Sequence, residues 1–337
     1  MAIEQKKPGY FSSLDLLRGL ASIAVIYFHF THGNKGYLSH DNPLFISGRY
    51  GFLGVDVFFV ISGFVIPYAM YRGRYKIENV GRFIAKRFIR IEPPYLISIV
   101  MVLTLNYLST LSPYYGGAPF HIDYTALGLH LGYFNAFFDY PWVNDVYWTL
   151  AIEFQYYLLI ALIFPLLLHP KKYLSIFAIT VFAVLGAFIT DHSLIFNYGL
   201  LFIVGILLFQ FQIGYLKKGE FGLMVLITLV LIFVKFDKRY LIAALLPYFF
   251  IMYFDFSNKF SRFLGNISYS LYLIHIPIGG RIINLTSTFT DDELIRSIFV
   301  FVAMAVSIFA SWIFFKLIEK PTMMLSKRLT YQKKKNR

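Results

Sequence analysis

The sequence predicts an all-α, polytopic integral membrane protein with about ten transmembrane helices, and it places both termini in the cytoplasm. Three observations predict this fold class: the apolar composition, the recurrence of apolar runs of membrane-spanning length, and the position of the basic residues between them. Of the 337 residues, 58% are hydrophobic, 20% are aromatic and 15% are charged, whereas soluble domains are roughly 45–50% apolar and about 25% charged. The composition therefore argues against a soluble globular protein.

Apolar runs recur along the whole chain, and a membrane-spanning helix needs roughly 20 mostly apolar residues. The first run follows a short polar tail and has no small-residue cleavage site, so we expect a retained helix there and not a signal peptide. The apolar part of residues 112–146 is short and interrupted by glycine, which favours a surface or re-entrant segment. The predicted spans are residues 13–32, 52–70, 94–111, 147–168, 173–190, 193–212, 221–236, 239–255, 264–281 and 296–317.

The basic residues set the orientation, because lysine and arginine collect on the cytoplasmic side of membrane proteins. With the N-terminus inside, 24 of the 31 basic side chains fall on the inner side. We expect one membrane domain at residues 1–320 and a basic cytoplasmic tail at residues 321–337. Topology and anionic lipid then explain the net charge of +13, and no nucleic-acid partner is expected. The outward-facing basic residues are Lys35, Arg49, Lys235, Lys238, Arg239, Arg281 and Arg296.

Two ionisable residues, Arg18 and His29, lie inside the first predicted span. A charge at the centre of a span costs roughly 2.5–3.5 kcal/mol, so such a residue needs a partner, a water-filled cavity or a function. Their separation of eleven residues places both on one helix face, about 16 Å apart along the axis. Arg18 could bind an anionic cosubstrate near the cytoplasm, and His29 could transfer a proton in the outer half. A snorkelling arginine and a hydrogen-bonded histidine would give the same pattern.

Three further ionisable residues, Glu153, Asp56 and His275, occupy the outer halves of other spans, at a depth similar to that of His29. This convergence favours a shared cavity in which Glu153 orients the His29 imidazole or accepts a proton from a hydroxyl. Each of the three could instead be a structural side chain in a buried pair. The candidate catalytic residues are thus His29, Glu153 and Arg18. The candidate substrate-binding residues are Asp56, Tyr269, Tyr272 and His275.

Four basic residues stand at three- or four-residue spacing just before the third span, which predicts a basic stripe on one helix. Arginine forks match phosphate groups well, so the stripe predicts a binding site for the phosphates of a cosubstrate. An interfacial anchor to anionic lipid is the alternative. The Pro93–Pro94 pair predicts a break at which an interfacial helix ends and the span begins. With Arg18, the candidate cosubstrate-binding residues are Arg82, Lys86, Arg87 and Arg90.

Several familiar chemistries have no signature in the sequence. The chain contains no cysteine, which excludes disulfides and thiolate catalysis and gives no sign of a structural zinc site. It also contains no G-x-S-x-G, no H-E-x-x-H and no Walker motif. We therefore expect neither a metal site nor ATP hydrolysis.

Six segments occur in order along nearly the whole chain: LDLLRGLASIAVIYFH, GFLGVDVFFVISGFVI, RFIAKRFIRIEPPY, WTLAIEFQYYLL, GNISYSLYLIHIP and KLIEKP. Together they resemble the acyltransferase-3 family of integral-membrane acyltransferases. The resemblance implies ten helices with the N-terminus inside, and transfer of an acyl group, most often acetyl from acetyl-CoA, to hydroxyls of envelope glycans or other small acceptors. It also implies that Arg18 and His29 are essential.

The sequence departs from the family pattern in two respects. Many members have a second acidic residue in the WTLAIEFQYY segment, where this chain has Phe154, so Glu153 is the only carboxylate there. Some members also carry an appended extracytoplasmic SGNH-type domain. Here we expect none, so that the membrane domain or a partner performs the acceptor chemistry.

These observations predict a transmembrane O-acyltransferase of the bacterial cytoplasmic (inner) membrane, with acetyl-CoA as the default donor cosubstrate. The CoA phosphates would bind Arg18 and the basic stripe, and the pantetheine arm would point toward His29. His29 would either deprotonate the acceptor hydroxyl or carry the acyl group transiently. Expected partners are membrane lipid, acyl-CoA and an envelope polysaccharide or lipid-linked glycan. No sequence feature decides the oligomeric state.

Two other functions are compatible with this class of protein. Buried ionisable residues also mark the pathways of transporters and flippases, although the chain shows no inverted repeat. Envelope-glycan polymerases and ligases are also polytopic and rich in aromatic residues. A long extracytoplasmic catalytic loop would favour them, and the longest outer segments here are residues 33–51 and 112–146.

Overall fold

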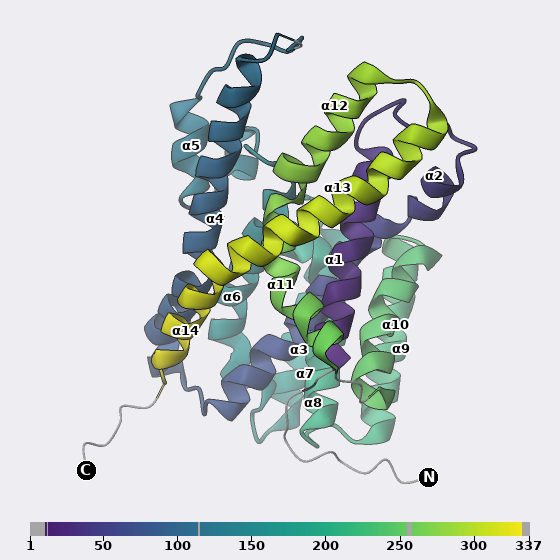
Figure 1. The fold of residues 1–337 in the computed structure, drawn as a ribbon. Coiled ribbons are helices and arrows are strands. Elements are labelled where there is room, and N and C mark those ends of the chain that lie inside the picture. The colour runs from purple at the N-terminus through teal and green to yellow at the C-terminus, as the bar shows by residue number, and fades with distance from the viewer. Residues whose placement is uncertain (1–10, 12, 114, 255–257, 332–337) are drawn as a thin grey trace.

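The computed structural model describes residues 11, 13–113, 115–254 and 258–331. Every regular element within these residues is a helix, which confirms the all-helical prediction (Figure 1). The long helices are α1 (Ser13–His32), α3 (Gly54–Arg72), α4 (Val80–Thr110), α6 (Trp148–Leu167), α7 (Lys172–Phe188), α8 (Gly199–Gln212), α9 (Lys218–Lys235), α10 (Lys238–Tyr253), α11 (Lys259–His275) and α13 (Glu293–Phe314). The shorter helices are α2 (Pro43–Gly48), α5 (Tyr124–His130), α12 (Arg281–Phe289) and α14 (Lys320–Arg328).

Six helical segments are long and apolar enough to cross a membrane, judged by length and composition. They contain α1, α3, α4, α6, α8 and α13. The four other predicted spans coincide with α7, α9, α10 and α11, which are shorter or carry more charged and polar residues. Residue 255, at the end of one predicted span, lies outside the described residues.

Helices α1 and α11 run parallel and pack closely through small residues. A Cβ atom on Gly19 would lie 2.5 Å from the Cβ of Leu264, and one on Gly265 would lie 2.5 Å from the Cβ of Asp15. Farther along, the Ser22 hydroxyl donates a 3.3 Å hydrogen bond to the Ser268 carbonyl. Small residues allow such close approach between membrane helices. The pairing brings the polar faces of both helices into the centre of the bundle.

Helix α4 continues without a break through the Pro93–Pro94 pair, so the predicted break is wrong. Pro94 has no N–H for the carbonyl of Arg90, and a proline inside a helix normally leaves such a carbonyl unpaired. Here the hydroxyl of Thr322 approaches the Arg90 carbonyl at 3.4 Å, and the hydroxyl of Tyr269 donates to the Ile91 carbonyl at 2.9 Å. The Thr322 hydroxyl of the neighbouring helix therefore partly replaces the donor that Pro94 lacks, which is one way in which membrane helices tolerate proline.

The segment between α4 and α6 contains the seven-residue helix α5, which is too short to cross a membrane, and two short 3-10 helices, Asn135–Phe138 and Asp145–Tyr147. Its last part is buried in the bundle. The Asn144 amide donates to the carbonyl of Leu273 at 3.1 Å, and the hydroxyls of Tyr147 and Ser98 lie 2.7 Å apart. As a result, α6 begins inside the protein and not at its surface.

At the C-terminal end, α13 passes through a π-helical turn at Phe315–Glu319 directly into α14. The predicted domain boundary at residue 320 thus falls within a continuous helical segment. The buried side chain of Tyr331 then packs on Phe83 of α4, with 6.5 Å between the ring centroids. Residues 332–337 of the predicted tail lie outside the described residues.

We expect Gly265→Leu to destabilise the protein, because the new side chain would collide with Asp15 and separate α1 from α11. Overpacking of this kind typically costs about 1–3 kcal/mol. The matched control is Gly222→Leu on α9, where no atom lies within 4 Å of an added Cβ. Thermal unfolding of the detergent-solubilised protein measures both variants. Equal melting temperatures would contradict the close packing of the two helices.

Candidate functional site

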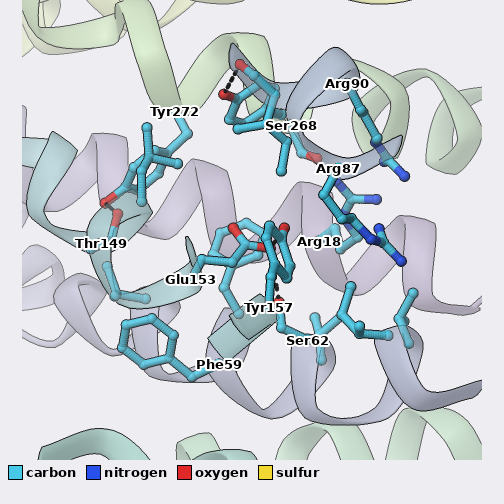
Figure 2. Close-up of a pocket in the computed structure, with 18 residues that line it drawn as sticks. Arg18, Phe59, Ser62, Arg87, Arg90, Thr149, Glu153, Tyr157, Ser268 and Tyr272 are labelled. Atoms are coloured by element: carbon cyan, nitrogen blue, oxygen red, sulfur yellow. Dashed lines mark hydrogen bonds between the residues drawn. The ribbon is translucent and has the colours of Figure 1, made fainter. Parts of the chain in front are cut away.

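The central pocket of the bundle lies where α1, α3, α4, α6 and α11 meet (Figure 2). It contains about 930 Å³ of space between atoms, solvent at its mouth included. Apolar and polar side chains share the wall, which combines apolar surface with groups that can form hydrogen bonds, as small-molecule sites do. The polar residues of the lining are Arg18, Ser62, Arg87, Arg90, Thr149, Glu153, Tyr157, Ser268, Tyr269 and Tyr272.

Three arginines from two helices gather at this pocket, Arg18 from α1 and Arg87 and Arg90 from α4 (Figure 2). Within the described residues, none of the three guanidinium groups lies within 4 Å of a carboxylate oxygen. Arg87 is only 8% exposed, and its Nε–H has no hydrogen-bond partner. Its guanidinium instead lies 5.5 Å from the ring centroids of Phe83 and Tyr157. The pocket therefore carries positive charge that could bind an anion.

The basic stripe on α4 divides between two environments. Arg82 donates a 2.8 Å hydrogen bond to the Tyr331 carbonyl, and the Lys86 ammonium lies 5.4 Å from the centroid of the Tyr331 ring. At 100° per residue, the Arg82 and Arg87 side chains point about 140° apart around the helix axis, so one pocket cannot hold both. The structure thus brings Arg87 and Arg90, but not Arg82 and Lys86, to the pocket with Arg18.

Glu153 is the carboxylate of the pocket lining. Its Oε1 accepts a 2.5 Å hydrogen bond from the hydroxyl of Tyr157, one helical turn later, and a 3.3 Å bond from the hydroxyl of Ser62 on α3. Two donors fix its orientation and leave Oε2 available to a ligand. The carboxylate interacts electrostatically with Arg18 and Arg87. Glu153 therefore interacts electrostatically with the arginine cluster of the pocket.

Within the described part of the chain no hydrogen bond or ion pair joins His29 to Glu153, so the structure does not bring the predicted pair together. The His29 ring packs against His275 of α11, with 5.1 Å between the ring centroids. The prediction assumed that α6 starts at the membrane surface, which would place Glu153 level with His29. Because α6 begins inside the protein at Trp148, Glu153 lies deeper, beside Tyr269 and Tyr272.

His275 has a defined tautomer. Its Nδ1 lies 3.1 Å from the Leu271 carbonyl and 2.9 Å from the Tyr272 carbonyl, and carbonyl oxygens only accept hydrogen bonds. The proton is therefore assigned to Nδ1, and Nε2 has a lone pair. This Nε2 is buried and unpaired. The Tyr272 side chain lines the pocket on one side and lies 6.1 Å from the His275 ring on the other, which connects the pocket with the His29–His275 pair.

Asp56 lies outside the pocket, contrary to the prediction that it shares a cavity with the other ionisable residues. It is 5% exposed and interacts electrostatically with Tyr198 and Tyr240, on the side of α3 that faces α8 and α10. Val55 and Ser62 of α3 line the pocket, seven residues apart on one face. Asp56 is rotated from Val55 by about 100° and therefore points away.

Sequence reasoning missed several residues of this region. Tyr157 follows Glu153 at the spacing of one helical turn, a signal that could have identified it. Glu319, in the KLIEKP segment, is 3% exposed and accepts hydrogen bonds from the backbone N–H of Ser270 at 3.1 Å and from its hydroxyl at 2.5 Å. It lies close enough to Arg18 and Arg90 to interact electrostatically with both. The other missed lining residues are Ser62, Thr149 and Ser268. The described residues contain no group of three or more histidine, aspartate or glutamate side chains that could hold a metal ion.

Comparison with known families gives a match to the model described as "Acyltransferase domain" over residues 11–316. The chain belongs to the acyltransferase-3 family. O-acetyltransferase OatA of Staphylococcus aureus strain NCTC 8325 / PS 47 is 28% identical, over 93% of this chain and 57% of that protein. OatA of strain MRSA252 gives the same values. The chain thus spans less than two thirds of the length of these acyltransferase-3 relatives. No solved structure matches it.

We expect Arg87→Met to raise the melting temperature of the purified protein. A buried charge without a carboxylate partner is costly, and replacing such groups by apolar ones of similar size can stabilise a protein by about 1–4 kcal/mol. Methionine would keep the contacts with Phe83 and Tyr157. The measurement is thermal unfolding in detergent, with Leu162→Met on the exposed face of α6 as the control. A lower melting temperature for Arg87→Met would indicate that Arg87 stabilises the fold and does not serve a ligand.

Proposed function

We propose that this chain is a transmembrane O-acyltransferase that takes an acyl group from acyl-CoA, with acetyl-CoA as the simplest donor. The acceptor is a hydroxyl of a cell-envelope glycan or a lipid-linked glycan. The observation that carries the proposal is the cluster of Arg18, Arg87 and Arg90 on one pocket, without a carboxylate within 4 Å among the described residues. Membership of the acyltransferase-3 family and the similarity to OatA support it.

The arginine cluster suits the phosphates of CoA. Guanidinium groups bind phosphate oxygens through pairs of parallel hydrogen bonds, and three of them match a donor that carries three phosphates. Glu153, fixed by Tyr157 and Ser62, limits the net positive charge and so reduces the repulsion between the arginines. We therefore propose that Glu153 holds the arginines of the donor site in position. This role replaces the expectation that Glu153 orients His29.

The acyl group would approach the two histidines past Thr149 and Tyr272, whose hydroxyls lie 2.7 Å apart in the wall of the pocket. Transfer forms an ester bond between the acyl carbonyl carbon and the acceptor oxygen and breaks the thioester C–S bond. The hydroxyl proton passes through His29, and the CoA thiolate finally takes it. If His29 carries the acyl group, the same bonds form and break in two steps. The unpaired Nε2 of His275 is placed to accept a hydrogen bond beside His29.

The proposed topology has ten spans with both termini in the cytoplasm, in the bacterial cytoplasmic membrane. The 24 basic residues of the predicted inner segments support it. Arg87 and Arg90 belong to the basic stretch between the second and third predicted spans, which is predicted to be cytoplasmic, so the donor pocket would open toward the cytoplasm. Membrane lipid, acyl-CoA and the glycan are the proposed partners.

The function is tested by labelled acetyl-CoA with the purified protein in detergent. We expect release of CoA that rises when a suitable envelope glycan is added. Persistent absence of both binding and turnover, with every donor chain length, would favour a transporter or flippase instead.

We expect Arg18→Lys to weaken donor binding almost as much as Arg18→Ala. A lysine ammonium is a point charge and does not reproduce a planar fork on phosphate oxygens. Titration of the purified variants with CoA measures the effect, and Leu162→Ala on the exposed face of α6 is the control. Wild-type affinity in the lysine variant would reduce Arg18 to a general positive charge.

We expect Glu153→Gln and His29→Ala to change different kinetic constants, because the two side chains lie in different parts of the site. The first variant should mainly raise the KM for acetyl-CoA. The second should lower kcat by about 10²- to 10⁴-fold, the usual range for lost acid–base assistance. Steady-state turnover with an accepted glycan separates the two effects, and size-exclusion chromatography checks that both variants fold. If both variants affected kcat alone, Glu153 would belong to the chemical step and not to the donor site.

A further inference from the structure

A second pocket lies at the opposite end of α4, lined by this helix, the segment around α5 and the beginning of α12. Figure 1 shows α5 beside that end of α4. Asn106 and Ser109 of its lining follow Arg90 by 16 and 19 residues, about 24–29 Å farther along the helix. It contains about 1050 Å³ of space between atoms, solvent at its mouth included. This volume is large enough for a small ligand, and it is separate from the donor pocket.

The polar side chains of the second pocket include groups that are only partly satisfied. The Arg281 guanidinium donates to the hydroxyl of Ser109 and, at 2.6 Å, to Oδ1 of Asn106, while its Nε–H is buried and unpaired. Asp123 accepts the backbone N–H groups of residues 125 and 126 through Oδ1, each at 2.9 Å. Its Oδ2 remains available. The pocket thus offers fixed donors and a fixed acceptor.

Aromatic side chains form the rest of the recognition surface. Tyr115, Phe120 and Trp142 line the same pocket as Asp123 and Arg281. A pyranose ring has an apolar C–H face that packs on an aromatic ring, and a rim of hydroxyls that exchange hydrogen bonds with carboxylate, amide and guanidinium groups. The mixture of aromatic rings with a few fixed polar groups therefore fits a sugar better than a lipid tail.

Helix α11 and its continuation connect the two pockets through the histidine pair. Tyr269 and Tyr272 line the donor pocket, His275 follows beside His29, and Arg281 lines the second pocket. His275 and Arg281 are six residues apart, across the π-helical turn Ile276–Gly280. The histidines thus stand between the two sites, as a group that acts on both donor and acceptor must.

We propose that the second pocket binds a sugar residue of the acceptor glycan and presents its hydroxyl toward the His29–His275 pair. This inference rests on the proposed O-acyltransferase function and assigns the acceptor site within it. Asp123 and Arg281 hold the hydroxyl rim, and Trp142 packs on the ring.

The first test uses the full-length protein in its native cells. We expect Trp142→Ala and Asp123→Asn each to lower the base-labile acetate on envelope polysaccharide at least tenfold, while the purified variants bind acetyl-CoA within twofold of wild type. Asparagine caps a helix as well as aspartate does, so Asp123→Asn keeps the start of α5 intact. The control is Trp312→Ala, on α13 and outside both pockets. Normal acetate in both variants would overturn the inference and leave the proposed function intact, whereas lack of acetyl-CoA binding by the wild type would overturn the function.

The second test identifies what occupies the pocket. A photo-crosslinking amino acid replaces Phe120 in the second pocket or Phe301 on the exposed face of α13. Irradiation of cells should give an adduct at position 120 and none at position 301. Periodate cleaves sugar diols, so it should destroy the adduct at position 120. An adduct at position 120 that resists periodate, equal sugar adducts at both positions, or no adduct would overturn the assignment of this pocket to a sugar.

Discussion

The structure depends on how the bundle holds three guanidinium groups around its central pocket, that of Arg87 buried and those of Arg18 and Arg90 half-buried. Removing a charge from water costs several kcal/mol even after the protein relaxes, and Arg18, Arg87 and Arg90 have no carboxylate within 4 Å among the described residues. Glu153 and Glu319 lie near them, but both carboxylates already accept hydrogen bonds from hydroxyl or backbone N–H groups. An anion bound in the pocket would offset the remaining positive charge. The proposed binding of an anionic cosubstrate would therefore explain why the fold keeps this cost.

The packing of the helices serves this arrangement. Close contact through Gly19 and Gly265 brings Arg18 of α1 beside the serine and tyrosine face of α11. Tyr269 of that face donates to the carbonyl of Ile91 next to the proline pair, and α4 runs unbroken from the arginines to the second pocket. One continuous helix therefore connects the proposed donor and acceptor sites, and α11 places the histidines between them.

The sequence predicted the helical class and the family, because apolar runs and short motifs are readable residue by residue. It did not predict which charged residues meet. The error for Glu153 was one of depth, since nothing local indicates that the chain before α6 is buried by Asn144 and Tyr147. The error for Asp56 was one of rotation, since its helix has apolar residues on every side and only the packing of α8 decides which face is which. Both depend on contacts between segments far apart in the sequence.

The central claim is that the donor binds on one side of the membrane and the acceptor on the other. Proteoliposomes that hold the protein in one known orientation test this arrangement most directly. Labelled acetyl-CoA is supplied either inside or outside the vesicles, and the glycan is supplied on the same side or on the opposite side. We expect labelled glycan when acetyl-CoA is on the cytoplasmic face of the protein and the glycan is on the other face. Labelling only when donor and acceptor share the same face would contradict it.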